Sequence, residues 1–353
     1  MKILIVTDAW HPQVNGVVRT LGHVAREAQA IGVDIEFLNP DQFRTLPMPS
    51  YPEIRLALAG SASIERRLEL VRPDAIHVAT EGPLGHAMRR VCLRQSLPFT
   101  TSFHTRFPDY LADRLPVPER WTSAATWAWL RRFHAPGAAV LAATPTLASE
   151  LTTRGFENVK LWPRGVDAGL FHPRASVNFN LPRPIFLTVG RLAVEKNLEA
   201  FLALDLPGTK LVVGDGPART TLARKFPEAV FIGSRHGEAL AEAYAAADVF
   251  VFPSRTDTFG LVLLEALASG VPIAAFPAAA PRDVIGQAPV GVLDDDLRRA
   301  CLGALECSRE DCRDFALDMT WAASARIFLD HVTQAVKSTR KITGTQSLPP
   351  IPA

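Results

Sequence analysis

Short apolar runs alternate with amphipathic stretches twice along this chain of 353 residues, and this repetition limits the possible folds more than any other feature. The apolar runs of the first half have the length of buried parallel strands and lie at 3–6, 35–38, 75–78, 98–101 and 138–142. The stretches between them have helical periodicity and lie at 17–30, 62–71, 84–95, 119–133 and 145–153. The alternation predicts a doubly wound α/β domain, whose ligands bind at the carboxyl ends of the strands.

The same alternation begins again after a Pro-containing segment at 171–184, which is typical of a linker. The expected strands of the second half lie at 185–189, 210–213, 230–232, 249–252 and 273–276, and the expected helices lie near 195–203, 217–226, 237–246 and 259–268. We therefore expect two Rossmann-like domains, at 1–172 and 184–319, that face each other across a cleft. Helical segments follow at 294–306 and 308–335. A helix at about 320–336 could pack back on the first domain, and the polar, Pro-rich residues 338–353 are expected to be disordered.

Composition indicates a globular protein, with 48% hydrophobic and 21% charged residues. The first apolar run ends at Asp8 and is too short for a signal peptide, and no uncharged apolar run has the length of a membrane span. Four cysteines without a plausible set of zinc ligands fit a reducing compartment, so we expect a cytoplasmic protein. Residues 55–132 hold twelve Arg against seven Asp and Glu, which could attract an anionic surface or form an ordinary arginine-rich exterior.

Two acidic residues stand out in the strand–helix–strand stretch at 249–276. Asp257 precedes the expected helix, where it or Thr258 can cap the first turn beside amides that bind an anion. Glu265 lies among leucines and alanines, and because an unpaired buried carboxylate costs roughly several kcal/mol, it should have a polar partner. For an isolated pair, a helix cap and a carboxylate that reaches solvent would be the favoured interpretation.

Cations and glycines follow other strands of the second half. Arg191 and Lys196 suit a diphosphate, because arginine binds it with two parallel hydrogen bonds and lysine binds it as a point charge. The glycine-rich turns would let a nucleotide lie against the backbone and contain Gly190, Gly214, Asp215 and Gly216. Each could be a simple turn, but turns of this kind at successive strand ends of one sheet indicate a nucleotide site.

The turns of the first half hold a second set of candidates. Gly16 precedes a helix and could let the backbone approach a phosphate, or form a simple turn, and the dinucleotide fingerprint is absent. A lone histidine is usually structural, but the strand-end position of His104 favours ligand contact. The expected acceptor-binding residues at this edge are Glu81, Gly82, Thr105 and Arg106.

Together these motifs resemble those of the retaining GT-B glycosyltransferases of family 4, over nearly the whole chain to about residue 335. The resemblance is carried in the second half by the motifs at 190–197, 214–216 and 256–272, and in the first half by those at 12–21, 102–105 and 164–173. These strings are similar to a subgroup that includes diacylglycerol glucosyl- and glucuronosyltransferases and mannosyltransferases that make glycolipids.

The resemblance implies a role for each candidate. Glu265 would bind the ribose hydroxyls of the donor. Asp257, which is one methylene shorter than the glutamate usual in the family, would bind the sugar hydroxyls. Arg191 and Lys196 would neutralise the diphosphate, and His104 would contact the hexose near its anomeric carbon. The other donor contacts would come from Gly16, Gly190, Gly214, Asp215, Gly216, Thr258, Phe259, Gly260 and Leu261.

The implied reaction retains the configuration of the sugar, with the diphosphate itself helping to deprotonate the acceptor. No cofactor or metal ion is expected, because fixed cations can stabilise the leaving diphosphate. The expected donor is a nucleotide-diphosphate sugar, with UDP-glucose or UDP-glucuronate favoured, and the expected acceptor is a lipid, with diacylglycerol favoured. The alternatives are a GDP-mannose donor or a soluble saccharide acceptor. Two alternatives outside the glycosyltransferases are a sugar-nucleotide epimerase and a non-catalytic binding protein. No nucleic-acid partner is expected.

A lipid acceptor is suggested by residues 114–134, where Trp121, Trp127 and Trp129 mix with Arg131 and Arg132. Helices that lie in a membrane interface combine tryptophan and arginine in this way. A helix that buries its tryptophans in the core is the alternative. We therefore expect a peripheral protein on the anionic inner face of the cell membrane.

Overall fold

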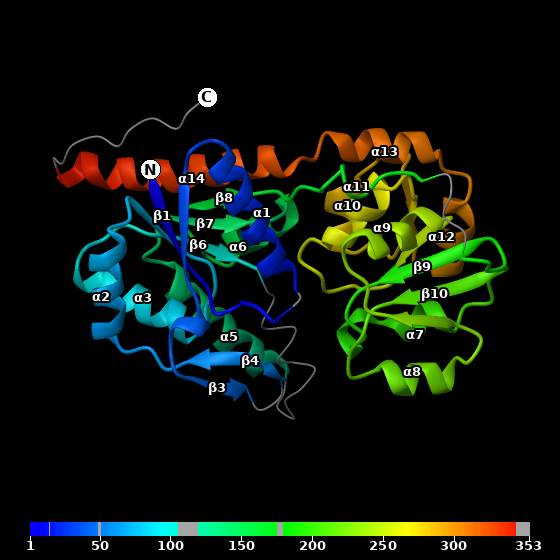
Figure 1. The fold of residues 1–353 in the computed structure, drawn as a ribbon, viewed down its shortest axis with the longest axis horizontal. Helices are drawn as coiled ribbons and strands as arrows, with labels where there is room; N and C mark the ends of the chain where they lie inside the picture. The colour runs from blue at the N-terminus through cyan, green and yellow to red at the C-terminus, as the bar shows by residue number, and fades with distance from the viewer. Residues whose placement is uncertain (14, 49–50, 105–118, 175–178, 344–353) are drawn as a thin grey trace. The chain divides into compact units, whose positions relative to one another are not determined.

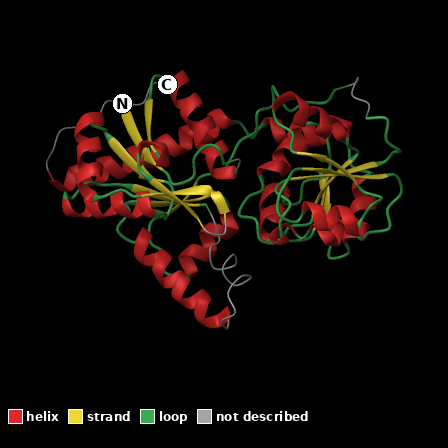
Figure 2. Cartoon of the chain, turned by 60° about the horizontal axis from the view of Figure 1, so that its bottom comes forward, coloured by secondary structure: helices red, strands yellow, loops and turns green. Residues whose placement is uncertain are grey.

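The computed structural model describes residues 1–13, 15–48, 51–104, 119–174 and 179–343, without the side chains of 51–54, 119–122 and 338–343. The chain forms two compact units. Unit 1 consists of 1–163 and 321–353, and unit 2 consists of 164–320. Each has a parallel sheet with helices on both faces, the Rossmann-like arrangement that the sequence predicts (Figures 1 and 2). Among the described helices, none is both long and apolar enough to cross a membrane.

Unit 1 is built on a six-stranded parallel sheet with the order β2-β1-β5-β6-β7-β8. Its strands are β1 (Lys2–Val6), β2 (Asp34–Leu38), β5 (Ala75–Val78), β6 (Thr100–Phe103), β7 (Ala139–Ala142) and β8 (Val159–Leu161). A separate antiparallel hairpin pairs β3 (Thr45–Met48) with β4 (Tyr51–Ala57). The helices are α1 (Gly16–Ala30), α2 (Ser61–Val71), α3 (Pro83–Arg94), α5 (Glu119–His134), α6 (Pro145–Thr153) and α14 (Trp321–Thr343).

The two faces of this sheet bury alternate residues of each strand, as a parallel sheet covered on both sides requires. In β1, Ile3 and Ile5 lie in the core that α1 and α14 cover, whereas Leu4 and Val6 lie in the core with α2 and α3. α1 and α14 pack side by side on one face (Figure 1). The first unit therefore includes a helix from the far end of the chain.

Unit 2 repeats the plan with the strand order β11-β10-β9-β12-β13-β14. Its strands are β9 (Ile185–Val189), β10 (Thr209–Val213), β11 (Val230–Gly233), β12 (Val249–Phe252), β13 (Ile273–Ala275) and β14 (Gly291–Leu293). The helices are α7 (Leu198–Leu202), α8 (Arg219–Lys225), α9 (Gly237–Ala246), α10 (Leu261–Ala268), α11 (Ala279–Ile285), α12 (Leu297–Ala304) and α13 (Arg309–Leu317). Short 3₁₀ turns lie at Pro40–Gln42 and Val194–Lys196.

The structure corrects several boundaries. The units divide after Pro163 and not at 172, because the following segment packs on unit 2: Phe171 is buried there, and Arg313 donates hydrogen bonds to the carbonyls of Phe171 and Ala168. The expected helix at 308–335 is two helices, α13 and α14, with a break between them. The disordered tail expected from 338 is wrong for 338–343, which continue α14, and the rest of it lies outside the described residues.

Strand β6 is displaced from its predicted place. The expected strand at 98–101 begins two residues too early, because β6 runs from Thr100 to Phe103 and contains three hydroxyl residues. A pattern that requires apolar residues cannot find such a strand. All four of its residues are buried, so their hydroxyls need partners within the protein.

Candidate active site

Helix α10 in unit 2 begins two residues later than predicted. The helix starts at Leu261, and Gly260 occupies the position before it with a left-handed φ of 80°. The N-cap position is occupied by Gly260 and not by Asp257 or Thr258 as expected, and a glycine has no side chain to act as a cap. The half-buried residues Phe259, Gly260 and Leu261 therefore lead into a first turn whose amides can bind an anion.

Gly260 is also required by packing. A side chain there would place its Cβ 3.0 Å from the Phe252 ring and 3.2 Å from a methyl of Leu263, at a backbone conformation that favours glycine. The turn after β12 is thus fixed against the strand that precedes it and the helix that follows it.

Glu265 is buried, with 3% of its surface exposed, and has the polar partner that its apolar neighbours require. The hydroxyl of Tyr244 on α9 donates to Oε2 of Glu265 over 2.9 Å. The hydroxyl of Ser269 donates to the backbone carbonyl of Glu265, also over 2.9 Å. Sequence reasoning did not identify Tyr244, and its only signal is a tyrosine within an alanine-rich helix. The alternative of a carboxylate that reaches solvent is wrong.

Lys196 and Asp257 meet in unit 2. Nζ of Lys196 lies 2.6 Å from Oδ1 of Asp257, and both side chains are partly exposed. Asn197 has a left-handed φ of 52° and donates a hydrogen bond to the carbonyl of Pro253 over 3.1 Å, which holds the two loops together. Among the described residues, Oδ2 of Asp257 is buried and has no hydrogen-bond partner. An oxygen of this kind is suited to accept a hydrogen bond from a bound hydroxyl.

Arg191 contacts an acidic residue that sequence reasoning did not select. Its Nη2 lies 2.7 Å from Oε1 of Glu195, which is four positions later in the chain. The side chain of Arg191 is 40% exposed, so a phosphate can approach its guanidinium from solvent. Because an arginine has five N–H donors, the contact with Glu195 leaves it able to bind a phosphate as well.

The glycines that follow β9 and β10 are held close together. A Cβ at Gly214 would lie 1.8 Å from the carbonyl oxygen of Gly190, and one at Gly216 would lie 2.5 Å from that of Leu192. These two glycines are therefore needed for contact between the two turns, whether or not a ligand binds. At Gly190 itself a Cβ would meet no described atom within 4 Å. Asp215 pairs with Arg219 over 2.7 Å, and both side chains are exposed.

In unit 1 the amides after Gly16 are already in use. Asn15 caps α1, and its Oδ1 accepts hydrogen bonds from the amides of Val17 and Val18, each over 3.0 Å. A phosphate at this helix end would have to replace that cap or bind beside it. Asparagine is a preferred residue at the N-cap, and Asn15 lies within the predicted motif at 12–21.

Glu81 and Gly82, two of the predicted acceptor-binding residues, are buried and half-buried respectively. Glu81 is 5% exposed, and its Oε1 lies 3.2 Å from Nε2 of the buried His134. A Cβ at Gly82 would lie 2.4 Å from the carboxyl carbon of Asp8. Burial raises the pKa of the Asp8 carboxyl above its ordinary value, while hydrogen bonds to it from Leu84, Thr80 and Gly85 lower it.

His104 directly follows β6 and is half-buried. Its ring lies edge-on to the indole of Trp162, with 5.9 Å between ring centroids. Thr105 and Arg106, the other two acceptor candidates, lie outside the described residues.

Helix α5 divides its tryptophans between core and surface. Trp127 is 8% exposed and stacks on Phe103 with 5.8 Å between ring centroids, so the interfacial prediction is wrong for it. Trp129 is 41% exposed, and Arg131 and Arg132 on the same helix are also exposed. The side chain of Trp121 is outside the described part of the helix.

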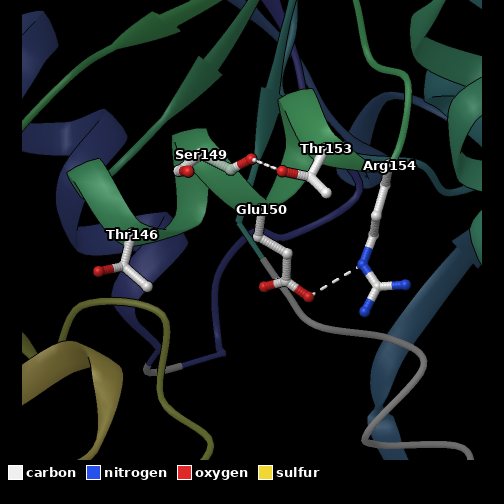
Figure 3. Close-up of a pocket in the computed structure, with 5 residues that line it drawn as sticks. All are labelled: Thr146, Ser149, Glu150, Thr153 and Arg154. Carbon is white, nitrogen blue, oxygen red and sulfur yellow. Dashed lines mark hydrogen bonds and ion pairs between the residues drawn. The ribbon is translucent and has the colours of Figure 1, made fainter.

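A pocket on unit 1 does not include any predicted site residue (Figure 3). Its lining residues come from α6 and the position after it, and are Thr146, Ser149, Glu150, Thr153 and Arg154. Glu150 and Arg154 pair over 3.0 Å, and the Thr153 hydroxyl donates to the Ser149 carbonyl over 2.9 Å (Figure 3). These polar groups satisfy one another on an exposed helix face.

Comparison with known proteins identifies the family. A family model described as Glycosyltransferase Family 4 matches residues 14–170, and one described as Glycosyl transferases group 1 matches residues 183–306. A GDP-mannose-dependent alpha-mannosyltransferase of Mycobacterium tuberculosis is 32% identical over 318 residues, which cover 83% of this chain and 83% of the relative. An alpha-monoglucosyldiacylglycerol synthase of Streptococcus pneumoniae is 24% identical over 349 residues, which cover 86% of this chain and 78% of that one.

Among solved structures, a sucrose-phosphate synthase from Thermosynechococcus elongatus matches with a TM-score of 0.76 at 20% identity, over 98% of this chain and all of the other. Two parallel-sheet units of this topology, with glycosyltransferases as structural neighbours, define the GT-B fold. The chain belongs to glycosyltransferase family 4.

Proposed function

We propose that this chain is a retaining glycosyltransferase that moves a hexosyl residue from a nucleotide-diphosphate sugar to a lipid acceptor. The observation that carries the proposal is the group of polar atoms around the start of α10 in unit 2. There the Lys196–Asp257 pair, the buried Oδ2 of Asp257 and the first turn of α10, which follows Gly260 at the N-cap position, belong to one set of adjoining loops.

The proposed chemistry follows from the charges that develop when a sugar–phosphate bond breaks. The ring becomes positive and the departing diphosphate becomes more negative. Arg191, Lys196 and the amides of α10 would stabilise the diphosphate without reorganising, because their positions are fixed before the reaction. The diphosphate would accept the proton of the acceptor hydroxyl as that hydroxyl attacks the same face of the sugar. No side-chain nucleophile is required, and metal independence remains a prediction.

The proposed sugar contacts come from Asp257 and His104, and the proposed ribose contact comes from Glu265. The unpartnered Oδ2 of Asp257 would accept a hydrogen bond from a sugar hydroxyl. Tyr244 would fix the orientation of the Glu265 carboxylate that accepts the hydrogen bond from the ribose.

For the donor, the relatives support a second candidate. The sequence favours UDP-glucose or UDP-glucuronate, whereas the relative that is 32% identical over most of the chain is named for GDP-mannose. GDP-mannose should therefore be tested beside the two UDP sugars. For the acceptor, diacylglycerol is supported by the name of the Streptococcus relative.

We propose that the enzyme works as a peripheral protein on the inner face of the membrane, with the exposed end of α5 as one contact. Trp129 offers an aromatic ring, and Arg131 and Arg132 offer positive charge to anionic lipids. In a flotation assay, Trp129→Ala should lower binding to anionic vesicles. Equal flotation of both proteins, or no flotation of either, would count against this contact.

The test of function is a radiolabel transfer assay with vesicles that contain diacylglycerol and with each of the three donors. Label should enter the lipid phase with one donor, persist in EDTA, and fall by at least about tenfold in Glu265→Gln, which keeps the side-chain volume and removes the charge. Glu150→Gln on the exposed face of α6 is the matched control and should keep wild-type activity. If a donor is only hydrolysed, the donor site is right and the acceptor is wrong. If no donor is consumed, the proposal fails.

A further inference from the structure

Strand β6 has an unusual composition for a central strand of a buried sheet. Thr100, Thr101 and Ser102 are all less than 2% exposed, although strands that are buried on both faces are normally runs of apolar residues. Each hydroxyl has a histidine as its partner. Nδ1 of His77 lies 2.8 Å from the Thr100 hydroxyl, and Nε2 of the same ring lies 2.8 Å from that of Ser102.

The position of His77 lets its two hydrogen bonds hold one face of β6. His77 lies on β5, directly opposite Thr100 in the parallel ladder. Side chains at 100, 102 and 104 share a face, because residues alternate along a strand. Both ring nitrogens of His77 therefore hold the two residues that precede His104 on its own side of the sheet. A hydroxyl can donate or accept, so the neutral imidazole is satisfied in either tautomer.

A second contact connects His77 to His104 through an aromatic ring. The indole of Trp162 lies edge-on to the His77 ring, with 6.1 Å between centroids, and edge-on to the His104 ring at 5.9 Å. Trp162 is completely buried and is held in turn by α14, since its Nε1 donates to the Ser324 carbonyl over 3.2 Å and its ring packs on Phe328 at 4.9 Å. Figure 1 shows α14 lying over this face of the sheet.

The opposite face of β6 is held separately. Thr101 is bonded over 2.8 Å to Nδ1 of His134, whose other nitrogen contacts Glu81. This second arrangement fixes the strand but does not contact the face that carries His104. His77 can therefore position His104, whereas His134 holds the opposite face of the strand.

We propose that His77 is a positioning residue for sugar transfer, which sets the place of His104 through the hydroxyls of β6 and the ring of Trp162. The proposal rests on the proposed function, in which His104 contacts the donor hexose near the reacting carbon. His77 is buried and touches no substrate, so its effect must pass through His104.

The test is a double-mutant cycle in the transfer assay. His77→Asn should lower kcat on the order of 10- to 100-fold with a change in donor KM below about twofold, because a small displacement of a group near the reacting carbon weakens the transition state more than the ground state. In the His104→Ala background the same change should cost less than about twofold. His77→Gln can keep a bond to Ser102, which is nearer to His104, and should recover kcat to within about threefold of the wild type.

The control for a general loss of stability is Thr209→Val in unit 2, which removes a hydrogen bond of 2.7 Å from a buried hydroxyl to the Pro182 carbonyl. It should lower the midpoint of unfolding and leave kcat unchanged. The positioning role would be overturned if His77→Asn lowered kcat equally in the wild type and in the His104→Ala background. It would also be overturned if His77→Asn left kcat unchanged. His104→Ala with full activity would overturn it as well, while leaving the donor site of unit 2 intact.

A readout independent of activity separates this inference from the proposed function. In protein labelled with ¹³C at histidine Cε1, the resonance of His104, identified by its loss in His104→Ala, should shift or broaden in His77→Asn. It should not change in Thr209→Val. If the wild type consumes no donor but this shift appears, the proposed function fails and the coupling of the two histidines stands. An unchanged His104 resonance in His77→Asn would refute the coupling directly.

Discussion

The hydrogen bond from Tyr244 to Glu265 gives a stability prediction that can be worked from the structure. Tyr244 is completely buried, and its ring contacts Phe171 at 5.6 Å and Phe250 at 5.7 Å between centroids. Tyr244→Phe keeps these ring contacts and removes only the hydroxyl that donates to Oε2 over 2.9 Å. A hydrogen bond to a charged group contributes about 1.5–3 kcal/mol. The unfolding equilibrium constant of unit 2 should therefore rise by about 10- to 150-fold.

The assay is a urea titration followed by hydrogen exchange in peptides from α9 and α10, which reports unfolding of this region. All six tryptophans of the chain lie in unit 1, so tryptophan fluorescence follows the other unit in the same samples. Thr209→Val is the comparison, because it also removes one buried hydroxyl but from a neutral carbonyl, and its cost should be smaller, about 1 kcal/mol. Unchanged protection of α9 and α10 in Tyr244→Phe would refute the reasoning, and so would a larger loss in Thr209→Val.

Three further predictions concern both units. Gly214→Ala should destabilise unit 2 by about 1–3 kcal/mol or more, because its Cβ would lie 1.8 Å from a carbonyl oxygen at a φ of 145°, and a thermal melt that matches the wild type would contradict this. Lys196→Met should weaken binding of a nucleoside diphosphate, measured by calorimetry, by at least about tenfold at low salt and by less at high salt. An equal effect at all salt concentrations would argue against a charge interaction. Asp8→Asn should gain stability relative to the wild type in urea titrations as the pH rises above about 4, the ordinary pKa of an aspartate. The raised pKa of Asp8 means that the folded protein keeps this proton to a higher pH than the unfolded chain, so the wild type loses stability as the pH rises above the unfolded value, and a constant difference would be contrary to this.

The alternation of apolar runs and amphipathic stretches was sufficient to predict the architecture, because a parallel sheet buries both faces and its strands are continuous apolar runs. Strand β6 was placed two residues too early because its residues are polar. Their partners His77 and His134 could not be predicted either, since they lie 23 and 33 positions away from the residues they contact. Such partners are set by tertiary structure. The edge strands β8 and β14 were missed since each has only three residues.

The site could be predicted as a set of residue types at strand ends but not as a set of contacts. The need of Glu265 for a polar partner followed from its apolar neighbours, whereas the identity of Tyr244 did not. Glu81 was predicted to bind the acceptor, but its contact with the buried His134 was not predicted, because a position after a strand does not determine which way a side chain faces. The role of Gly214 as a packing residue depends on a second turn, and a single turn in the sequence does not reveal it.

The composition of unit 1 from two separated parts of the chain has a consequence for biosynthesis. Unit 2 is continuous and can be complete in the growing chain before α14 has been made. Until then, Trp162 and the apolar residues beside it, Ile3, Ile5, Val24 and Leu141, lack the cover that Phe328, Leu329 and Val332 provide. The first domain to be synthesised is therefore the last to be finished, and until then the part of its sheet face that α14 covers is an exposed apolar surface of the nascent protein.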